Sequence, residues 1–346
     1  MKTLRLDRSA LVSKGLEGVV LVHDVRDTKG RIAVPKGKIL TGSDVKHLGE
    51  LPWDTLHAVA PEPGDLHELA AGERLACAAA GSGVTPATYG SGHWPLVAQQ
   101  RGILSVHTGA MKAINRLAGV AVYTLFDGQV VDGAETVGRT KIVPFVIAGD
   151  IVVRAEAIAR DAGGLVTVRP FRPTTVGAVV QESLGESALS RFRDALGEKV
   201  AWLASRLLAP RVVVPDAGDV ADAIAGVIDE GARVVVLAGS RPMDPLDAAF
   251  DALSRLGARI ARHGAPAHPG SLLWLAWVDD VPVVGMPSCG LFSRATVFDL
   301  VFPRLLAGEP VDGDWFAELG HGGLLTRDMA FRFPAYRASR DRGEVE

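Results

Sequence analysis

The second half of this sequence alternates short apolar runs with longer amphipathic stretches. Strands that are apolar throughout, rather than at every second residue, belong in a sheet that is covered on both faces. The runs predicted as strands are residues 175–180, 211–214, 233–237, 272–278 and 281–285. The stretches predicted as helices are residues 188–207, 220–230, 245–256 and 292–306. Because helix-length crossovers make a sheet parallel, the pattern predicts a doubly wound, mainly parallel α/β domain over residues 174–310.

The first half of the sequence lacks this regular alternation. Residues 1–165 contain short β-branched runs, turns and a few helical stretches, which predicts a strand-rich, mixed α+β region that could hold two subdomains. One short helix is expected to begin with Ser43 as its N-cap. Residues 166–173 hold two prolines and form a stiff connector, so we place the domain boundary there. Residues 311–346 are interpreted as a C-terminal extension.

Composition excludes several classes of protein. With 37 basic and 40 acidic residues the net charge is −3, which predicts no surface for nucleic acid or for an anionic membrane. The longest apolar stretch, residues 272–278, is far shorter than the ~20 residues of a membrane helix, and the N-terminus lacks an apolar segment of signal-peptide length. The two cysteines are far apart, so neither a disulfide framework nor a zinc site is expected. A cytoplasmic protein is predicted.

A ligand site is expected at one edge of the predicted sheet, because ligands of such sheets lie beyond the carboxyl ends of the strands. Four loops should meet there: residues 181–187, 238–247, 265–271 and 286–293. Each is rich in Gly, Ser, Pro or acidic residues, which suits backbone amides that face a phosphate or a polar heterocycle. Neither the G-x-G-x-x-G nor the G-x-x-x-x-G-K-[ST] motif occurs, which disfavours dinucleotide and P-loop chemistry.

Four residues in these loops have two interpretations each. Asp244 and Asp247 start a predicted helix, where a carboxylate either caps exposed N–H groups or binds a metal ion or activates a hydroxyl. Cys289 lies between a strand and a helix, a position that lowers the pKa of a thiol. No histidine accompanies it in a motif, so close approach of the backbone to a ligand is favoured over a catalytic thiolate. His268 either reaches the same cleft or is a hydrogen-bonded loop residue.

Lys141 and Cys77, both in the first half of the sequence, each have a favoured interpretation. Lys141 either steers an anion into a cleft or is a solvated lysine on a strand, and the second interpretation is favoured. Cys77 lies in an alanine-rich helical stretch and is expected to pack in a core.

Four segments of the predicted α/β domain carry a family resemblance. In chain order they are residues 176–184, Leu237-Ala-Gly-Ser240, Pro269-Gly270 before a strand, and Val284-Gly-Met-Pro-Ser-Cys-Gly290. Together they resemble the MoaB/Mog-type molybdopterin-binding domain, which also forms part of the molybdopterin molybdotransferases. The segments Lys141-Ile-Val-Pro-Phe145 and Val168-Arg-Pro-Phe-Arg-Pro173 extend the similarity to variant proteins that accompany molybdenum hydroxylases.

The resemblance implies a ligand and roles for the loop residues. The ligand would be molybdopterin, its nucleotide form or the finished molybdenum cofactor, with Mg²⁺ as an accompanying ion. Asp244 and Asp247 would be catalytic, and Asp244 would be a metal ligand. A molybdenum hydroxylase would be a partner, and the chain would form a homo-oligomer. The residues implied in ligand binding are Gln181, Glu182, Gly239, Ser240, His268, Pro269, Gly270, Ser288, Cys289 and Gly290.

The sequence departs from the catalytic members of this family at two loops. Those members have a Gly-Gly-x-Ser turn and a Pro-Gly-Asn-Pro-type loop, where this chain has Ala238-Gly-Ser-Arg241 and Pro287-Ser-Cys-Gly290. Ligand binding is therefore favoured over adenylyl transfer or metal insertion. The leading hypothesis is a molybdopterin-binding protein of cofactor biosynthesis or maturation, which would be a transferase for molybdate or a nucleotide if it is catalytic. The alternatives are a non-catalytic carrier for a molybdenum hydroxylase and, less favoured, a hydrolase of nucleotide derivatives.

Overall fold

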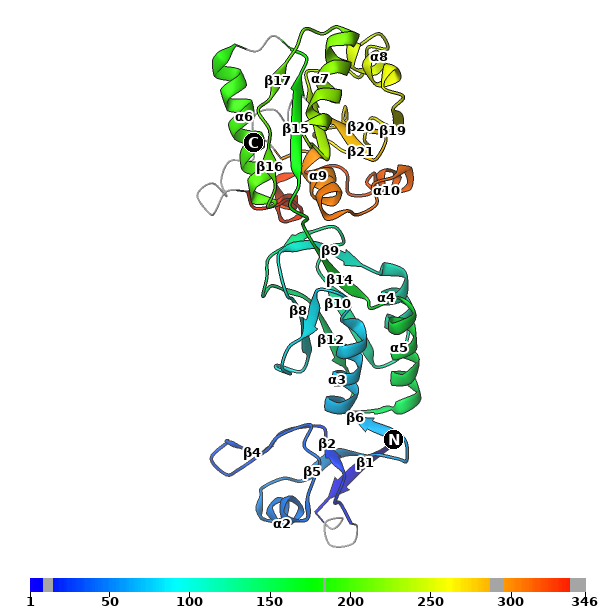
Figure 1. The fold of residues 1–346 in the computed structure, drawn as a ribbon. Coiled ribbons are helices and arrows are strands. Elements are labelled where there is room, and N and C mark those ends of the chain that lie inside the picture. The colour runs from blue at the N-terminus through cyan, green and yellow to red at the C-terminus, as the bar shows by residue number, and fades with distance from the viewer. Residues whose placement is uncertain (9–14, 183–184, 287–294, 337–346) are drawn as a thin grey trace. The chain divides into compact units, whose positions relative to one another are not determined.

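The computed structural model describes the chain except for residues 9–14, 183–184, 287–294 and 337–346. It contains two compact units (Figure 1). The first unit comprises residues 1–100, 105–125 and 132–168, and the second comprises residues 101–104, 126–131 and 169–346. Two short segments of the first half of the sequence therefore fold with the second half. Within the described residues, none of the helices has the length and apolar content that a membrane crossing requires.

The first unit is mixed α+β and is built from small antiparallel sheets. Its strands are β1 (Lys2–Asp7), β2 (Val20–Leu21), β3 (Val25–Arg26), β4 (Ile32–Val34), β5 (Thr55–Ala60), β6 (Asp65–His67), β7 (Val84–Pro86), β8 (Trp94–Ala98), β10 (Val120–Thr124), β12 (Thr136–Ile142) and β13 (Val146–Ala148). Its helices are α2 (Gly42–Glu50), α3 (Glu68–Ala79), α4 (Thr108–Asn115) and α5 (Gly149–Asp161). Cys77 is exposed on α3, so its predicted core position is wrong. Its neighbours Leu75, Ala76 and Ala79 form the buried face of that helix instead.

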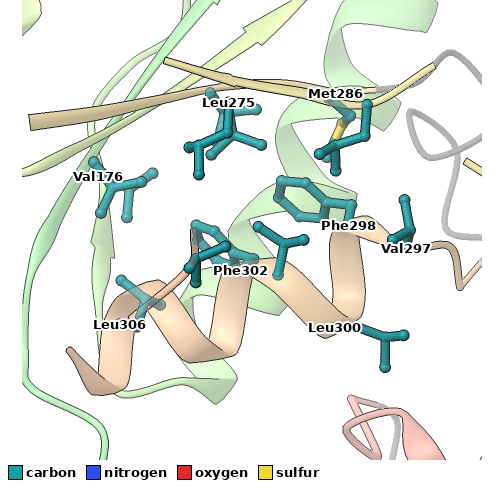
Figure 2. Packing of buried hydrophobic residues seen from close by; sticks show 14 of the residues in the cluster. Val176, Leu275, Met286, Val297, Phe298, Leu300, Phe302 and Leu306 are labelled. Atoms are coloured by element: carbon teal, nitrogen blue, oxygen red, sulfur yellow. The ribbon is translucent and has the colours of Figure 1, made fainter. Parts of the chain in front are cut away.

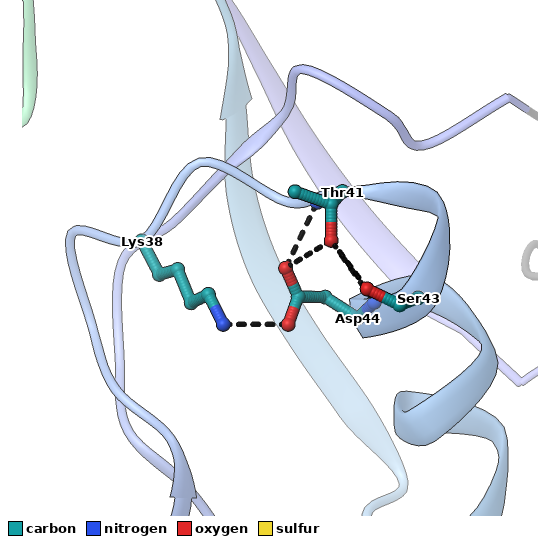
Figure 3. Close-up of polar contacts among 4 residues, drawn as sticks. All are labelled: Lys38, Thr41, Ser43 and Asp44. Atoms are coloured by element: carbon teal, nitrogen blue, oxygen red, sulfur yellow. Dashed lines mark hydrogen bonds and ion pairs between the residues drawn. The ribbon is translucent and has the colours of Figure 1, made fainter.

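Helix α2 shows how local sequence determines where a helix begins. Its N-cap is Thr41, not Ser43 as predicted, because Thr41 and Asp44 form a capping box. The Asp44 carboxylate accepts hydrogen bonds from the Thr41 backbone N–H at 2.9 Å and from Lys38 Nζ at 2.6 Å (Figure 3). Ser43 is the second residue of the helix, and its hydroxyl shares a hydrogen bond with the Thr41 hydroxyl at 2.9 Å. The acid three residues after the cap, rather than the hydroxyl closest to the apolar pattern, marks the helix start.

We expect the contribution of Asp44 to stability to disappear in acid. Hydrogen bonds from the Lys38 side chain first, and then from Thr41, lower the pKa of the Asp44 carboxyl from 3.8 to about 2. Because this pKa is depressed in the folded chain, the contribution is complete above pH 3.8 and is lost as the pH falls toward 2. Thermal unfolding of the wild type and Asp44→Asn should differ at neutral pH and converge in acid. Ser43→Ala is the control, and a difference that stays constant with pH would contradict this role.

The second unit contains a mixed sheet in the order β16-β15-β18-β21-β20-β19, and β17 also pairs with β15. Its strands are β15 (Thr175–Val180), β16 (Arg206–Leu207), β17 (Arg211–Val212), β18 (Val234–Ala238), β19 (Arg259–His263), β20 (Trp274–Val278) and β21 (Val281–Gly285). The pairs that involve β15 and the pair of β18 with β21 are parallel. The two-residue turn between β20 and β21 makes these strands antiparallel, as are β19 and β20. The predicted mixed α/β class is confirmed, and the sheet has an antiparallel edge.

Helices pack on both faces of this sheet. They are α6 (Glu186–Trp202), α7 (Ala217–Asp229), α8 (Ala248–Arg255), α9 (Phe298–Ala307) and α10 (Gly313–Glu318), followed by the 3₁₀-helix η2 (Arg327–Arg332). Strand β18 explains the apolar runs, because Val234 and Val236 join one buried cluster while Val235 and Leu237 join the other. Residues of α6 and α9 belong to the first cluster, and residues of α7 and α8 belong to the second.

Helix α9 brings the largest side chains to the first cluster. Phe298 and Phe302 are fully buried and stack with their ring centroids 4.9 Å apart, below Leu275 of β20 and below Met286, which follows β21 (Figure 2). The same cluster contains Ile103, from the short boundary strand β9 (Gly102–Val106), which pairs with β11 (Val130–Val131). Strand β14 (Val166–Pro170) lies in the segment 166–173, where the domain boundary was predicted. Phe316 of α10 is buried in this cluster too, so the segment after residue 311 contributes to the core.

Candidate functional site

Three parallel strands end side by side and define the edge where the site was predicted. In the sheet register, Val180 of β15 is paired with Ala238 of β18, and Leu237 of β18 is paired with Gly285 of β21. The residues that follow these strands therefore leave the sheet at the same edge. Two of the predicted site residues, Gln181 and Gly239, occupy these first positions.

Gln181 is buried at this edge, with 3% of its surface exposed. Its backbone N–H donates to Ala238 O at 3.0 Å, and its side-chain Nε2 donates to Asp247 Oδ1 at 2.8 Å. Because a carboxylate only accepts hydrogen bonds, the amide nitrogen must face Asp247 and the amide oxygen must point away from it. Among the residues that the structure describes, none forms a hydrogen bond with the buried Gln181 Oε1. Such an oxygen is costly unless a donor reaches it, so the site has one unused acceptor.

Asp247 is the N-cap of α8 and is 8% exposed. Its Oδ1 accepts from Ala249 N at 3.0 Å as well as from Gln181, and its Oδ2 accepts from Arg241 N at 2.9 Å. The carboxylate therefore closes the loop between β18 and α8 and joins this loop to Gln181. Asp247 is positioned as a structural cap whose oxygens are already used.

Asp244 has a different environment from Asp247, although both acids precede the same helix. Its side chain is exposed, and Oδ1 accepts from Leu246 N at 2.9 Å in a short turn. Its backbone oxygen accepts from Asp247 N at 3.2 Å. Of the two acids, Asp244 is thus the one whose carboxylate faces solvent.

The turn at Gly239 and Ser240 depends on two close contacts. Gly239 has a φ of +85°, and a Cβ atom there would lie 2.8 Å from Glu182 Cβ. Glycine is therefore required both for the left-handed backbone and for the close approach of the two loops. Ser240 Oγ accepts a hydrogen bond from Trp274 Nε1 at 3.0 Å, while Glu182 itself is exposed.

The His268–Gly270 loop is held by other segments. His268 N–H donates to Gly323 O at 2.8 Å, and its carbonyl accepts from Leu325 N at 2.7 Å. Val297 N–H donates to Pro269 O at 3.1 Å. Gly270 has a φ of +109°, and a Cβ there would lie 2.6 Å from Val297 Cγ1. The His268 side chain is exposed, and among the described residues no hydrogen bond joins it to Gln181 or Asp247.

Four other residues named in the sequence analysis are not part of the described arrangement. Ser288, Cys289 and Gly290 lie outside the described residues. Lys141 lies on β12 in the first unit. Within the described part of the chain, no group of three or more His, Cys, Asp or Glu side chains could hold a metal ion.

The sequence analysis did not predict a buried ion pair between α6 and α9. Lys199 Nζ of α6 lies 2.6 Å from Asp299 Oδ1 of α9, and the two side chains are 5% and 0% exposed. Asp299 Oδ2 also accepts from Thr296 N at 2.8 Å, which links the pair to the segment beside Pro269. Burial, and then the Asp299 charge, raise the pKa of the Tyr336 phenol well above its usual value. An acid inside the apolar stretch 297–302 was the available signal.

Solved structures of molybdenum cofactor biosynthesis proteins show a distant similarity to this chain. No protein-family model matches the sequence, and no curated protein matches it. Among solved structures, a molybdenum cofactor biosynthesis protein from Pyrococcus furiosus is 11% identical, with a TM-score of 0.27, over 89% of this chain and 65% of that one. A molybdopterin biosynthesis MoeA protein from Pyrococcus horikosii is 13% identical, with a TM-score of 0.31, over 89% of this chain and 75% of that one.

A third solved structure matches only part of the chain. It is a molybdenum cofactor biosynthesis protein from Corynebacterium diphtheriae, 15% identical with a TM-score of 0.27, over 44% of this chain and 98% of that one. TM-scores this low do not establish a shared fold. This chain spans about two thirds of the length of the P. furiosus protein.

Proposed function

We propose that this protein binds molybdopterin, or a nucleotide form of it, in the biosynthesis or maturation of the molybdenum cofactor. The observation that carries the proposal is the buried Gln181 Oε1, which has no hydrogen-bond partner among the described residues, at the edge where three parallel strands end. A pterin ring carries N–H groups that can donate to such an oxygen. The sequence resemblance described above names the ligand, and the edge of the sheet is where ligands of such folds bind.

The loops around Gln181 suggest how the rest of the ligand would be held. Backbone amides at Gly239 and Ser240 would hold the phosphate, together with those of residues 288–290. The glycine at position 239 has no side chain to separate the backbone from a bound group. Exposed Asp244 would contact the pterin, Mg²⁺ or the metal that is being inserted.

The hydrogen bonds of Asp247 support a non-catalytic carrier as a second candidate function. Asp247 already accepts three hydrogen bonds from the chain, which leaves little capacity for a metal ion or a reacting hydroxyl. A carrier that delivers the finished cofactor to a molybdenum hydroxylase needs binding but no general base. We therefore propose the non-catalytic carrier as the second function, with molybdate insertion or nucleotide transfer as the catalytic form of the first.

Substitution of the two acids separates these functions. Asp244→Asn keeps the exposed turn and should leave molybdopterin affinity within a few fold if the protein is a carrier. Asp247→Asn should instead weaken binding by destabilising the loop, since its cap contributes ~1 kcal/mol. Affinity is measured by fluorescence titration, and turnover is measured with molybdopterin, ATP and molybdate. Turnover by the wild type that Asp244→Asn abolishes would establish the transferase and exclude the carrier.

A further inference from the structure

The second unit contains a cavity of about 150 Å³ that shares no residue with the site at the sheet edge. It lies between the turn at residues 126–129 and the helices α9, α10 and η2. Side chains from each of these elements line it, including Phe126, Asp127, Arg304, Trp315, Leu319 and Arg332. A cavity of about this volume accommodates a molecule of the size of benzene.

Arg304 forms a fixed, charge-balanced wall of the cavity. It is 7% exposed, and its Nη2 donates to Asp127 Oδ2 at 3.1 Å. Its guanidinium lies over the Trp315 ring, 5.2 Å from the centroid. Gly128 has a φ of +78°, and a Cβ there would lie 2.6 Å from Arg304 Nη2. The turn at residues 126–129 therefore packs closely against the Arg304 guanidinium, which is already paired with the Asp127 carboxylate.

Arg332 is the second cation of the cavity, and its charge is not balanced in this way. Its Nη1 donates to Gly322 O at 2.7 Å, which is a neutral acceptor. Among the residues that the structure describes, no carboxylate forms an ion pair with it. Burial lowers the pKa of Arg332. A partly buried guanidinium with donors to spare favours an anion from outside the chain.

Charge and shape limit the kind of anion that fits. Asp127 and Glu318 also line the cavity, so they would repel a dianion such as phosphate more strongly than a monoanion. Phe126, Trp315 and Leu319 are apolar side chains in a lining whose accessible surface is mostly polar, and the Phe126 ring packs against Phe331 of η2 at 5.3 Å between centroids. We propose that this cavity binds a small organic monocarboxylate with a planar apolar body, whose carboxylate pairs with Arg332.

Titration of the full chain with benzoate tests this proposal, with acetate and inorganic phosphate as comparison ligands. Benzoate should bind most tightly and should shift the Trp315 indole N–H resonance, which Trp315→Phe identifies. Arg332→Gln should weaken benzoate binding by at least about tenfold, because a charge-assisted pair is lost. Arg332→Lys should keep part of it. Arg327→Gln is the matched control, since Arg327 is an exposed arginine of the same 3₁₀-helix.

Three outcomes would overturn the proposal. The first is that benzoate leaves the Trp315 resonance of the wild type unchanged, a result that does not depend on whether any Arg332 variant folds. The second is that Arg327→Gln weakens binding as much as Arg332→Gln does. The third is that phosphate binds more tightly than benzoate and loses its affinity in Arg332→Gln, which would make the cavity a phosphate site.

Discussion

Replacement of Asp299 by leucine should lower the free energy of unfolding of the second unit by about 3–5 kcal/mol. The Lys199 side chain is 5% exposed, and the substitution removes the carboxylate that lies 2.6 Å from its ammonium group. The rings of Phe298 and Tyr336, 5.6 and 5.3 Å from Lys199 Nζ, stabilise a cation only weakly by comparison. Asp299→Leu also removes the acceptor of the Thr296 N–H. Urea denaturation followed by circular dichroism measures the loss.

Two further variants show whether the pair itself is responsible. Lys199→Met combined with Asp299→Leu removes both charges and should restore much of the stability, because no unpaired charge stays buried. Asp194→Asn is the control on α6, since Asp194 pairs with Arg193 at the surface, where both side chains are more than half exposed. It should change stability by less than about 0.5 kcal/mol. A double variant as unstable as Asp299→Leu would show that the loss does not come from the unpaired lysine.

Replacement of Gly285 by alanine should destabilise the second unit. The same change should disturb the Ser240 turn of the candidate site. A Cβ at position 285 would lie 2.1 Å from two atoms of the fully buried Trp274 indole. The indole must move, and its hydrogen bond to Ser240 Oγ would be lost with it. Overpacking of this kind costs about 1–3 kcal/mol, and the lost bond adds about 1 kcal/mol.

The matched control for this variant is Gly313→Ala. Nothing lies within 4 Å of a Cβ at Gly313, so this substitution in α10 should leave stability nearly unchanged. Denaturation of both variants gives the comparison, and Trp fluorescence reports the movement of the indole. Equal stabilities for Gly285→Ala and Gly313→Ala would show that the indole can move at no cost.

The sequence predicts the α/β class because β15 and β18 are buried on both faces and must be apolar throughout. It does not predict the direction of β20, since an apolar run has the same appearance in a parallel and an antiparallel pair. Strand β19 was missed because its sequence, Arg259 to His263, is mostly polar and partly exposed at the sheet edge. Periodic patterns thus reveal buried strands better than edge strands.

The candidate site was predicted only in outline, for a related reason. Strand order predicts that the residues after β15 and β18 leave the sheet at one edge, but it does not predict the pairing of Gln181 with Asp247, which joins residues 66 positions apart. Likewise, Lys199 and Asp299 are 100 positions apart. Asp244 and Asp247 are indistinguishable in sequence, and only the turn between them decides which one caps α8. Contacts between distant loops leave no local signal.

Molybdopterin binding by the wild type and by Gln181→Leu tests the central claim most directly. Gln181→Leu removes Oε1 together with the Nε2 hydrogen bond to Asp247 and retains a buried side chain of similar size, whereas Asp247→Asn changes the carboxylate that accepts this bond and keeps Oε1. Gln100→Leu, at an exposed position, is the control. We predict that the wild type and Gln100→Leu bind molybdopterin alike, and that Gln181→Leu binds at least about tenfold more weakly while it stays folded by circular dichroism. No binding by the wild type, or equal binding by a folded Gln181→Leu, would contradict the proposed site.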